Sequence, residues 1–114
     1  MKTITLLTKP IIVNRKHIIA RNRLILSKEY RDTKEAMQWE IKSTWGTTAP
    51  LAGVVTLNIM FYYGDNRKRD IDAYLKILLD SMSGIVYEDD DQIVEMHVFK
   101  ETDKSNPRTV IQIL

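Results

Sequence analysis

Acidic side chains crowd into the second half of this chain. Asp70 and Asp72 form an Asp-x-Asp pair directly after the basic run 67–69, and Lys76 follows four residues later. The cluster 88–91, Glu-Asp-Asp-Asp, comes about a dozen residues after Lys76. Neighbouring carboxylates resist ionising together, and a bound divalent cation offsets their repulsion. Oxygen ligands of this kind suit Mg²⁺ or Mn²⁺, and basic neighbours suit a phosphate-rich substrate, so the pattern predicts a metal-dependent nuclease.

Two segments of the chain would have to meet to build such a site. Asp70 and Asp72 are expected where a loop ends and a helix begins, and a helix N-terminus favours ionised carboxylates. The segment 89–91 is expected just before a strand, from which it can return to the same edge of the sheet. Three carboxylates from these segments could hold two metal ions about 3.5–4 Å apart, and Lys76 could bind the scissile phosphate. The simpler alternative is that Asp72 and Lys76 form an ordinary helix ion pair while Asp70 only caps the helix.

Size and charge bound the class of protein. The 114 residues suffice for one domain, residues 1–114, and the chain has no cysteine for disulfides or thiolate chemistry. No apolar run approaches the ~20 residues of a membrane span, so we expect no membrane partner and a cytoplasmic protein. The first 28 residues carry seven Lys or Arg and no acidic residue, whereas residues 70–95 carry eight acidic residues and one Lys. This separation indicates phosphate binding around a metal site, and the alternative is that both regions are solvated surface.

The expected secondary structure alternates strands and helices. We expect a strand at 4–7, a basic loop or ribbon at 14–23, a helix from Ser27 to about Thr44, a strand at 54–63, a helix from Asp70 or Asp72 to Met82, and strands at 92–100 and 108–114. This order predicts an α+β fold, a single domain in which two helices pack on one mixed β-sheet. Trp39 and Trp45 are both expected in or near the core, although either could stack on an exposed base.

The acidic region also carries a longer signature. It resembles that of the RusA-like Holliday junction resolvases, endodeoxyribonucleases usually found in phages and prophages. The matching residues are Arg69, Asp70, Asp72, Lys76, Asp80, Met82, Gly84, Asp89, Asp90, Gln92 and Ile93. The similarity covers about residues 54–114, and the first fifty residues match only in layout. The resemblance implies a dimeric, Mg²⁺-dependent enzyme, with Mn²⁺ as a possible substitute, that resolves four-way DNA junctions by paired symmetric nicks in recombination and repair.

The resemblance also implies roles for single residues. The catalytic residues fall on Asp70, Asp72, Lys76 and Asp90, and the metal ligands on Asp70, Asp72 and Asp90, with the neighbouring Asp89 as an outer-shell ligand. The spacing to Gln92 selects Asp90, because Asp91 then occupies the variable position before the glutamine. One position departs from the family pattern: Ala73 stands where the family usually has Asn. Loss of that amide would loosen the start of the helix or alter the geometry at the metal.

Two basic segments are expected to bind the DNA. They contain Arg15, Lys16, Arg21 and Arg23 in the first and Arg67, Lys68 and Arg69 in the second. A four-way junction is two-fold symmetric and the chain has one acidic cluster, so a homodimer is expected to make the two nicks. Two alternatives stay open: a catalytically weak protein that binds branched DNA on the same scaffold, and an acidic metal-binding regulatory module with no nucleic-acid partner.

Overall fold

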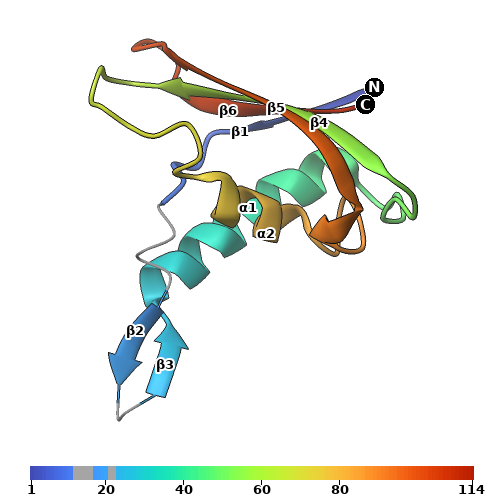
Figure 1. The fold of residues 1–114 in the computed structure, drawn as a ribbon, viewed down its shortest axis with the longest axis horizontal. Coiled ribbons are helices and arrows are strands. Elements are labelled where there is room, and N and C mark those ends of the chain that lie inside the picture. Colours follow the sequence, from blue (N-terminus) through green and yellow to red (C-terminus); the bar gives the residue numbers. More distant parts are fainter. Residues whose placement is uncertain (12–16, 21–22) are drawn as a thin grey trace.

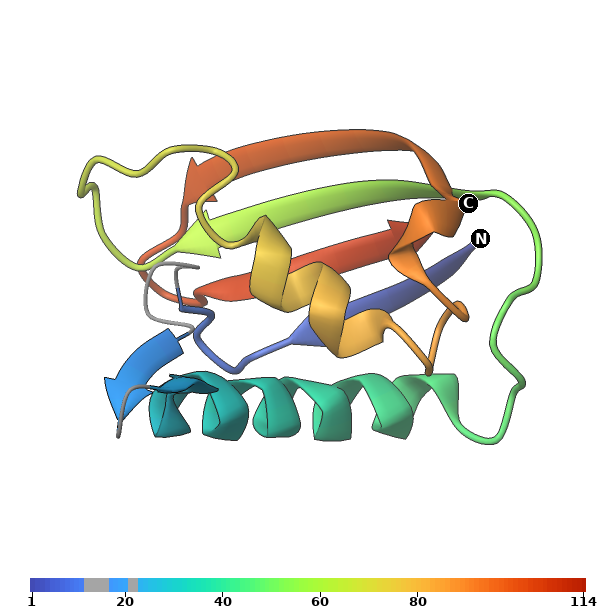
Figure 2. The same ribbon diagram turned by 60° about the horizontal axis from the view of Figure 1, so that its bottom comes forward.

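Two helices cover one face of a four-stranded sheet in the computed structural model of this protein (Figures 1 and 2). The structure describes residues 1–11, 17–20 and 23–114, with only the backbone described at 17–20 and 23–26. The helices are α1, Lys28–Trp45, and α2, Leu75–Met82; the strands are β1, Lys2–Leu6, β2, His17–Ala20, β3, Arg23–Leu26, β4, Val55–Tyr63, β5, Ile93–Thr102, and β6, Arg108–Ile113. The predicted α+β fold, a single domain with two helices packed on one mixed sheet, is confirmed.

The strand order in the sheet is β1-β6-β4-β5. Strand β6 runs antiparallel to both of its neighbours, β1 and β4. Strands β4 and β5 are parallel, because the connection between them, which contains α2, returns the chain over one face of the sheet. In the parallel pair, Val55 lies beside Ile93 and Tyr63 beside Thr102. A segment that follows β4 and a segment that precedes β5 therefore start at opposite ends of the same strand pair. This topology decides how the candidate site is built.

The core lies between the sheet and the helices. Alternate residues of β4 are almost fully buried, as the two-residue period of a half-covered strand predicts. The helix α1 buries Tyr30, Met37, Ile41 and Trp45 at helical spacing, and its first turn is capped by the Ser27 hydroxyl, which accepts from the Tyr30 backbone N–H (3.1 Å). The tryptophan prediction is half right: Trp45 is 4% exposed, but Trp39 is 71% exposed.

A two-stranded ribbon projects from the rest of the molecule (Figure 1). It is formed by β2 and β3, which pair antiparallel from His17 with Leu26 to Ala20 with Arg23. This agrees with the predicted basic ribbon, although Arg15, Lys16 and Arg21 lie outside the described residues. Within the described ranges, no helix has the length and apolar character needed to cross a membrane.

Candidate active site

Asp70 and Asp72 lie in an exposed turn before α2. The backbone N–H of Ala73 donates to the Asp70 carbonyl (3.1 Å), and that of Leu75 donates to the Asp72 carbonyl (3.2 Å). The predicted helix start is wrong by three to five residues, because regular helix begins only at Leu75. In the described part of the chain, neither carboxylate forms an ion pair or hydrogen bond. Both are therefore available to a ligand from outside.

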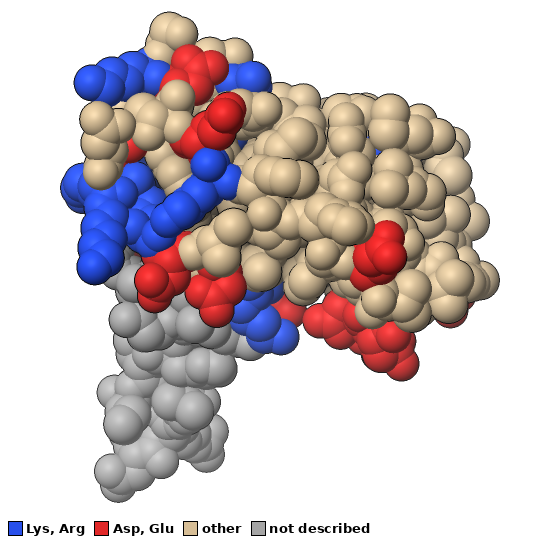
Figure 3. All heavy atoms as spheres, turned by 45° about the horizontal axis from the view of Figure 1, so that its top comes forward, with Lys and Arg blue, Asp and Glu red and all other residues tan. Residues whose placement is uncertain are grey.

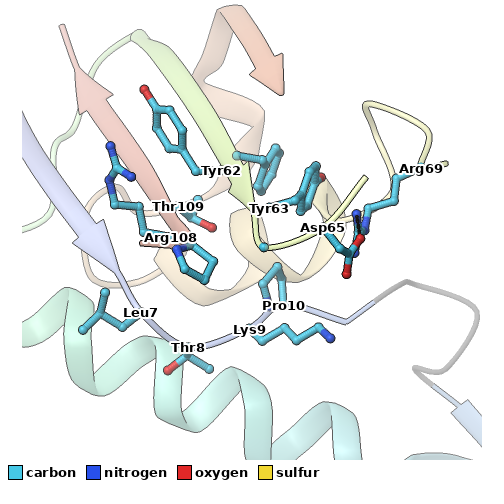
Figure 4. A pocket seen from close by; sticks show the side chains of 13 residues that line it. Leu7, Thr8, Lys9, Pro10, Tyr62, Tyr63, Asp65, Arg69, Arg108 and Thr109 are labelled. Atoms are coloured by element: carbon cyan, nitrogen blue, oxygen red, sulfur yellow. Dashed lines mark ion pairs between the residues drawn. The ribbon is translucent and has the colours of Figure 1, made fainter. Parts of the chain in front are cut away.

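Arg69 is held inside the protein, unlike the two basic residues before it. Its guanidinium lies 2.9 Å from a carboxylate oxygen of Asp65 and 4.3 Å from the centre of the Tyr63 ring, and its side chain is only 10% exposed. Figure 4 shows Asp65 and Arg69 facing each other at the edge of a pocket of about 260 Å³. The Tyr74 ring packs on the same tyrosine, with the centres 5.9 Å apart. Arg69, predicted as a DNA contact, is engaged with Asp65 and Tyr63 within the loop.

The ion pair also changes the acidity of its carboxylate. Hydrogen bonds from Arg69 and from the Arg67 backbone hold the pKa of Asp65 well below its usual range. Asp65 thus stays ionised at the base of the loop, where its charge is already matched.

Arg67 and Lys68 are the exposed cations of this loop. They line a groove of about 620 Å³ together with Lys9 and Asp70. Figure 3 shows Lys and Arg side chains gathered at the end of the molecule where this loop lies. A basic groove beside an exposed carboxylate can hold a phosphate backbone next to a metal ligand.

Lys76, in the first turn of α2, points to the next turn of the same helix. Its ammonium lies 3.1 Å from one carboxylate oxygen of Asp80, and the other oxygen accepts a hydrogen bond from the buried Tyr30 hydroxyl. The pKa of Lys76 is raised, first by its hydrogen bond with Asp80 and further by the nearby charges of Asp80 and Asp90. The alternative ion pair between Asp72 and Lys76 is not formed.

Gln92 ties the acidic segment to a distant loop. Its side-chain oxygen accepts from the backbone N–H groups of Glu88 (2.8 Å) and Asp89 (2.9 Å). Its side-chain nitrogen donates to the carbonyls of Leu51 and Gly53, both at 2.8 Å. The amide thereby makes all four of these bonds at once, and it fixes the backbone on which Asp90 stands.

Asp90 is half-buried, whereas Asp89 and Asp91 on either side are exposed. Its pKa is raised, chiefly by a hydrogen bond with Asp89 and by burial, with a further contribution from Asp80, while Lys76 lowers it. Asp90, Asp80 and Lys76 thus act on one another, although they come from two segments. Of the residues predicted for the site, the structure brings Lys76 and Asp90 close enough for their charges to interact.

The predicted metal ligands are not gathered around one point. Among the described residues, no three acidic or histidine side chains lie close enough to hold a metal ion. The parallel strands explain this: Lys100 of β5 donates to the Arg69 carbonyl, next to Asp70, whereas Asp90 lies just before Ile93, where β5 begins. Lys100 lies near the end of β5, whereas Ile93 is its first residue. The donors fit Mg²⁺ by their chemistry, since all are hard carboxylate oxygens.

Some residues of this region had no role assigned from the sequence. Asp80 and Gln92 stood in the signature, but their partners Tyr30 and Leu51 are 50 and 41 residues away along the chain. No local pattern points to contacts of that range. Asp65 had a weaker signal, because it precedes Arg69 by four residues.

Comparison with protein families gives a match over almost the whole chain. A family model described as "Endodeoxyribonuclease RusA" matches residues 8–114, which include every candidate catalytic residue. No curated protein sequence matched the chain.

Proposed function

This chain belongs to the endodeoxyribonuclease RusA family, and we propose that it is a Mg²⁺-dependent nuclease that resolves four-way DNA junctions by paired nicks. Members of the family are Holliday junction resolvases that act on branched DNA. The observation that carries the proposal to particular residues is the mutual electrostatic effect of Lys76 and Asp90, which come from two segments of the chain. A phosphate-cleaving site needs a cation within electrostatic reach of its metal-binding carboxylates.

Asp70, Asp72 and Asp90 are the residues that would hold the metal, with Asp89 beside them. Mg²⁺, or Mn²⁺ in its place, would lower the pKa of the attacking water and stabilise the leaving oxygen. The exposed carboxylates of Asp70 and Asp72 make no ion pair in the described structure, so binding a cation breaks no existing contact. The pKa of Asp90 is raised, chiefly by its hydrogen bond with Asp89 and by burial, and a bound cation would favour its ionised form.

Lys76 supplies a fixed positive charge to the reaction. Its raised pKa keeps the ammonium protonated, so it can bind a non-bridging oxygen of the scissile phosphate. Groups that stabilise developing negative charge in this way are typically worth ~2.7–4 kcal/mol, roughly a hundred- to thousandfold in rate.

Arg67 and Lys68 are the residues we propose for contact with the DNA backbone, because both are exposed on the groove beside Asp70. Arg69 supports them from within, through its ion pair with Asp65. The N-terminal basic segment, with Arg15, Lys16, Arg21 and Arg23, stays a second predicted contact.

We propose that the protein acts as a homodimer. The junction is two-fold symmetric and each chain has one acidic cluster, so two copies related by a two-fold axis would make the paired nicks. A phage or prophage origin follows from the same family resemblance and is testable from the neighbouring genes.

The deciding experiment is cleavage of a synthetic four-way junction with Mg²⁺, beside a gel shift in EDTA. Paired symmetric nicks that disappear in Asp90→Asn support the proposal. Binding without nicks supports a catalytically weak junction-binding protein, which is favoured by Ala73 at the usual Asn position and by the separated carboxylates. A protein that neither binds nor nicks the junction would contradict both of these functions and leave the acidic metal-binding regulatory module.

A further inference from the structure

Asp80 connects the core of the molecule to Lys76. It lies in the second turn of α2, its side chain is 17% exposed, and it uses both carboxylate oxygens. One oxygen lies 3.1 Å from the Lys76 ammonium, and the other accepts from the hydroxyl of Tyr30, which is 1% exposed in α1. A chain of contacts thus runs from a rigid core side chain to a half-exposed cation.

The Tyr30 hydroxyl makes this contact persistent. Burial and the neighbouring Asp80 carboxylate raise the pKa of Tyr30 far above its usual value, so the hydroxyl keeps its proton and donates. A carboxylate withdrawn from water is costly unless it is hydrogen-bonded, and here each oxygen has a partner. Both groups therefore hold Asp80 in one orientation, whereas an exposed aspartate would sample several.

A lysine ammonium sits on a flexible four-carbon stem, so its position depends on its partners. Lys76 is about half exposed (47%), and its charge also acts on Asp90. The matching pair on the surface is Lys28 with Asp32, also four residues apart on a helix, with side chains 82% and 57% exposed. That pair has the same chemistry without the buried partner, and exposed pairs of this kind are weak.

We propose that Asp80 is a positioning residue for the nuclease reaction: backed by Tyr30, it holds the Lys76 ammonium toward the Asp90 segment, where the scissile phosphate would bind. This inference rests on the proposed function. Asp80 does not touch the substrate and acts only through Lys76. Its removal should therefore slow the chemical step and leave junction binding unchanged.

The test is a double-mutant cycle in single-turnover nicking of a four-way junction, with saturating enzyme and Mg²⁺. Asp80→Asn should slow nicking by roughly tenfold to a hundredfold, as misplacement of a reacting partner does. The junction Kd should stay within about twofold, and Tyr30→Phe should act in the same direction but less. The nicking rates of the double variant Lys76→Ala/Asp80→Asn and of Lys76→Ala should agree within about threefold. The control Asp32→Asn should match wild type.

Three results would overturn the inference: a wild-type rate for Asp80→Asn, an effect on Kd alone, or a full additional loss in the double variant. Melting temperatures identify a variant that fails to fold, and Tyr30→Phe then takes its place. A wild-type protein that does not nick, or a harmless Lys76→Ala, defeats the proposed function instead. In that case the Lys76 ammonium signal in ¹H–¹⁵N spectra still decides: it should be protected from exchange in wild type and Asp32→Asn and lost in Asp80→Asn. Equal exchange in all three would refute the positioning role.

Discussion

The two halves of the candidate active site are held in different ways. The acidic segment 88–92 is anchored by the side chain of Gln92, which bridges it to the loop at 51–53, and the charges of Asp90 and Lys76 act on each other. In the turn 70–74, Asp70 and Asp72 are exposed and the backbone forms two short-range hydrogen bonds. The two carboxylates have no protein partner in the described structure. One half is positioned by the protein, and the other leaves its ligands for an outside group to engage.

This difference follows from where each half sits in the fold. The segment 88–92 leads directly into β5, so the sheet fixes its position. The turn 70–74 lies within the connection between β4 and β5, before α2. A metal bound by both halves would have to draw the exposed turn toward the fixed segment. Metal binding and the position of Asp70 and Asp72 are therefore coupled in the proposed reaction.

The largest expected effect comes from removing single carboxylates. Asp70→Asn, Asp72→Asn and Asp90→Asn should each lower single-turnover nicking at saturating Mg²⁺ by at least roughly a hundredfold, because each removes a negatively charged metal ligand. Asp91→Asn is the control, and its exposed side chain predicts a mild effect. An essential Asp91 with a dispensable Asp90 would show that the assignment is off by one residue.

The melting temperatures of the same three aspartate variants also distinguish the two halves of the site. Without metal, Asp90→Asn should melt at or above the wild-type temperature, because the raised pKa of Asp90 means that its charge is unfavourable in the folded protein. Mg²⁺ should raise the melting temperature of wild type and not of the three variants. A marked loss of stability in metal-free Asp90→Asn would contradict this picture.

The next effect tests how firmly the fixed half is held. Gln92→Leu removes four hydrogen bonds, each worth ~0.5–1.5 kcal/mol, and part of this loss is recovered by water. We expect a melting temperature lower by roughly 10 °C. Gln112→Leu is the matched control, since its amide accepts a single long bond from Asn58 (3.3 Å). Equal losses in the two variants would mean that Gln92 does not anchor the segment.

A smaller effect should appear in DNA binding by the exposed loop. Arg67→Ala/Lys68→Ala should weaken junction binding and reduce the slope of log K against log salt by about two, since each phosphate contact contributes about 0.9. Lys34→Ala/Lys42→Ala on α1 has the same charge change and serves as the control. An unchanged slope in the loop variant, or an equal reduction in the control, would place this loop off the DNA.

The smallest effect concerns the ion pair of Asp65 with Arg69, in the loop before the turn 70–74. The pKa of Asp65 is lowered in the folded protein, so its ionised form contributes stability above its unfolded pKa of about 3.9 and loses it as the pH falls below that value. Asp65→Asn should therefore melt slightly below wild type at pH 7, and the difference should shrink steadily as the pH falls below about 4. Melting curves across this range are the measurement. A difference independent of pH would show that the charge of Asp65 is not what stabilises the loop.

The sequence by itself determined the elements that depend on local pattern. Helix α1 and strand β4 begin and end within about a residue of their predicted bounds, because capping at Ser27 and strict alternation after Val54 act over a few neighbouring residues. The α+β class followed from the order of these elements. The candidate catalytic residues were identified from the family resemblance, and among them the charges of Lys76 and Asp90 act on each other in the fold.

The tertiary structure decided everything that depends on distant partners. The parallel pairing of β4 with β5 keeps the two groups of carboxylates apart. The Arg69 guanidinium packs on the Tyr63 ring, against which Tyr74 also lies. The Tyr30 hydroxyl of α1 donates a hydrogen bond to Asp80 of α2. None of these contacts leaves a periodic trace in the sequence, because each depends on how the segments pack against one another. Periodicity indicates which face of a helix or strand is buried. Only the packed fold determines which residues contact that face and which partners the neighbouring polar groups find.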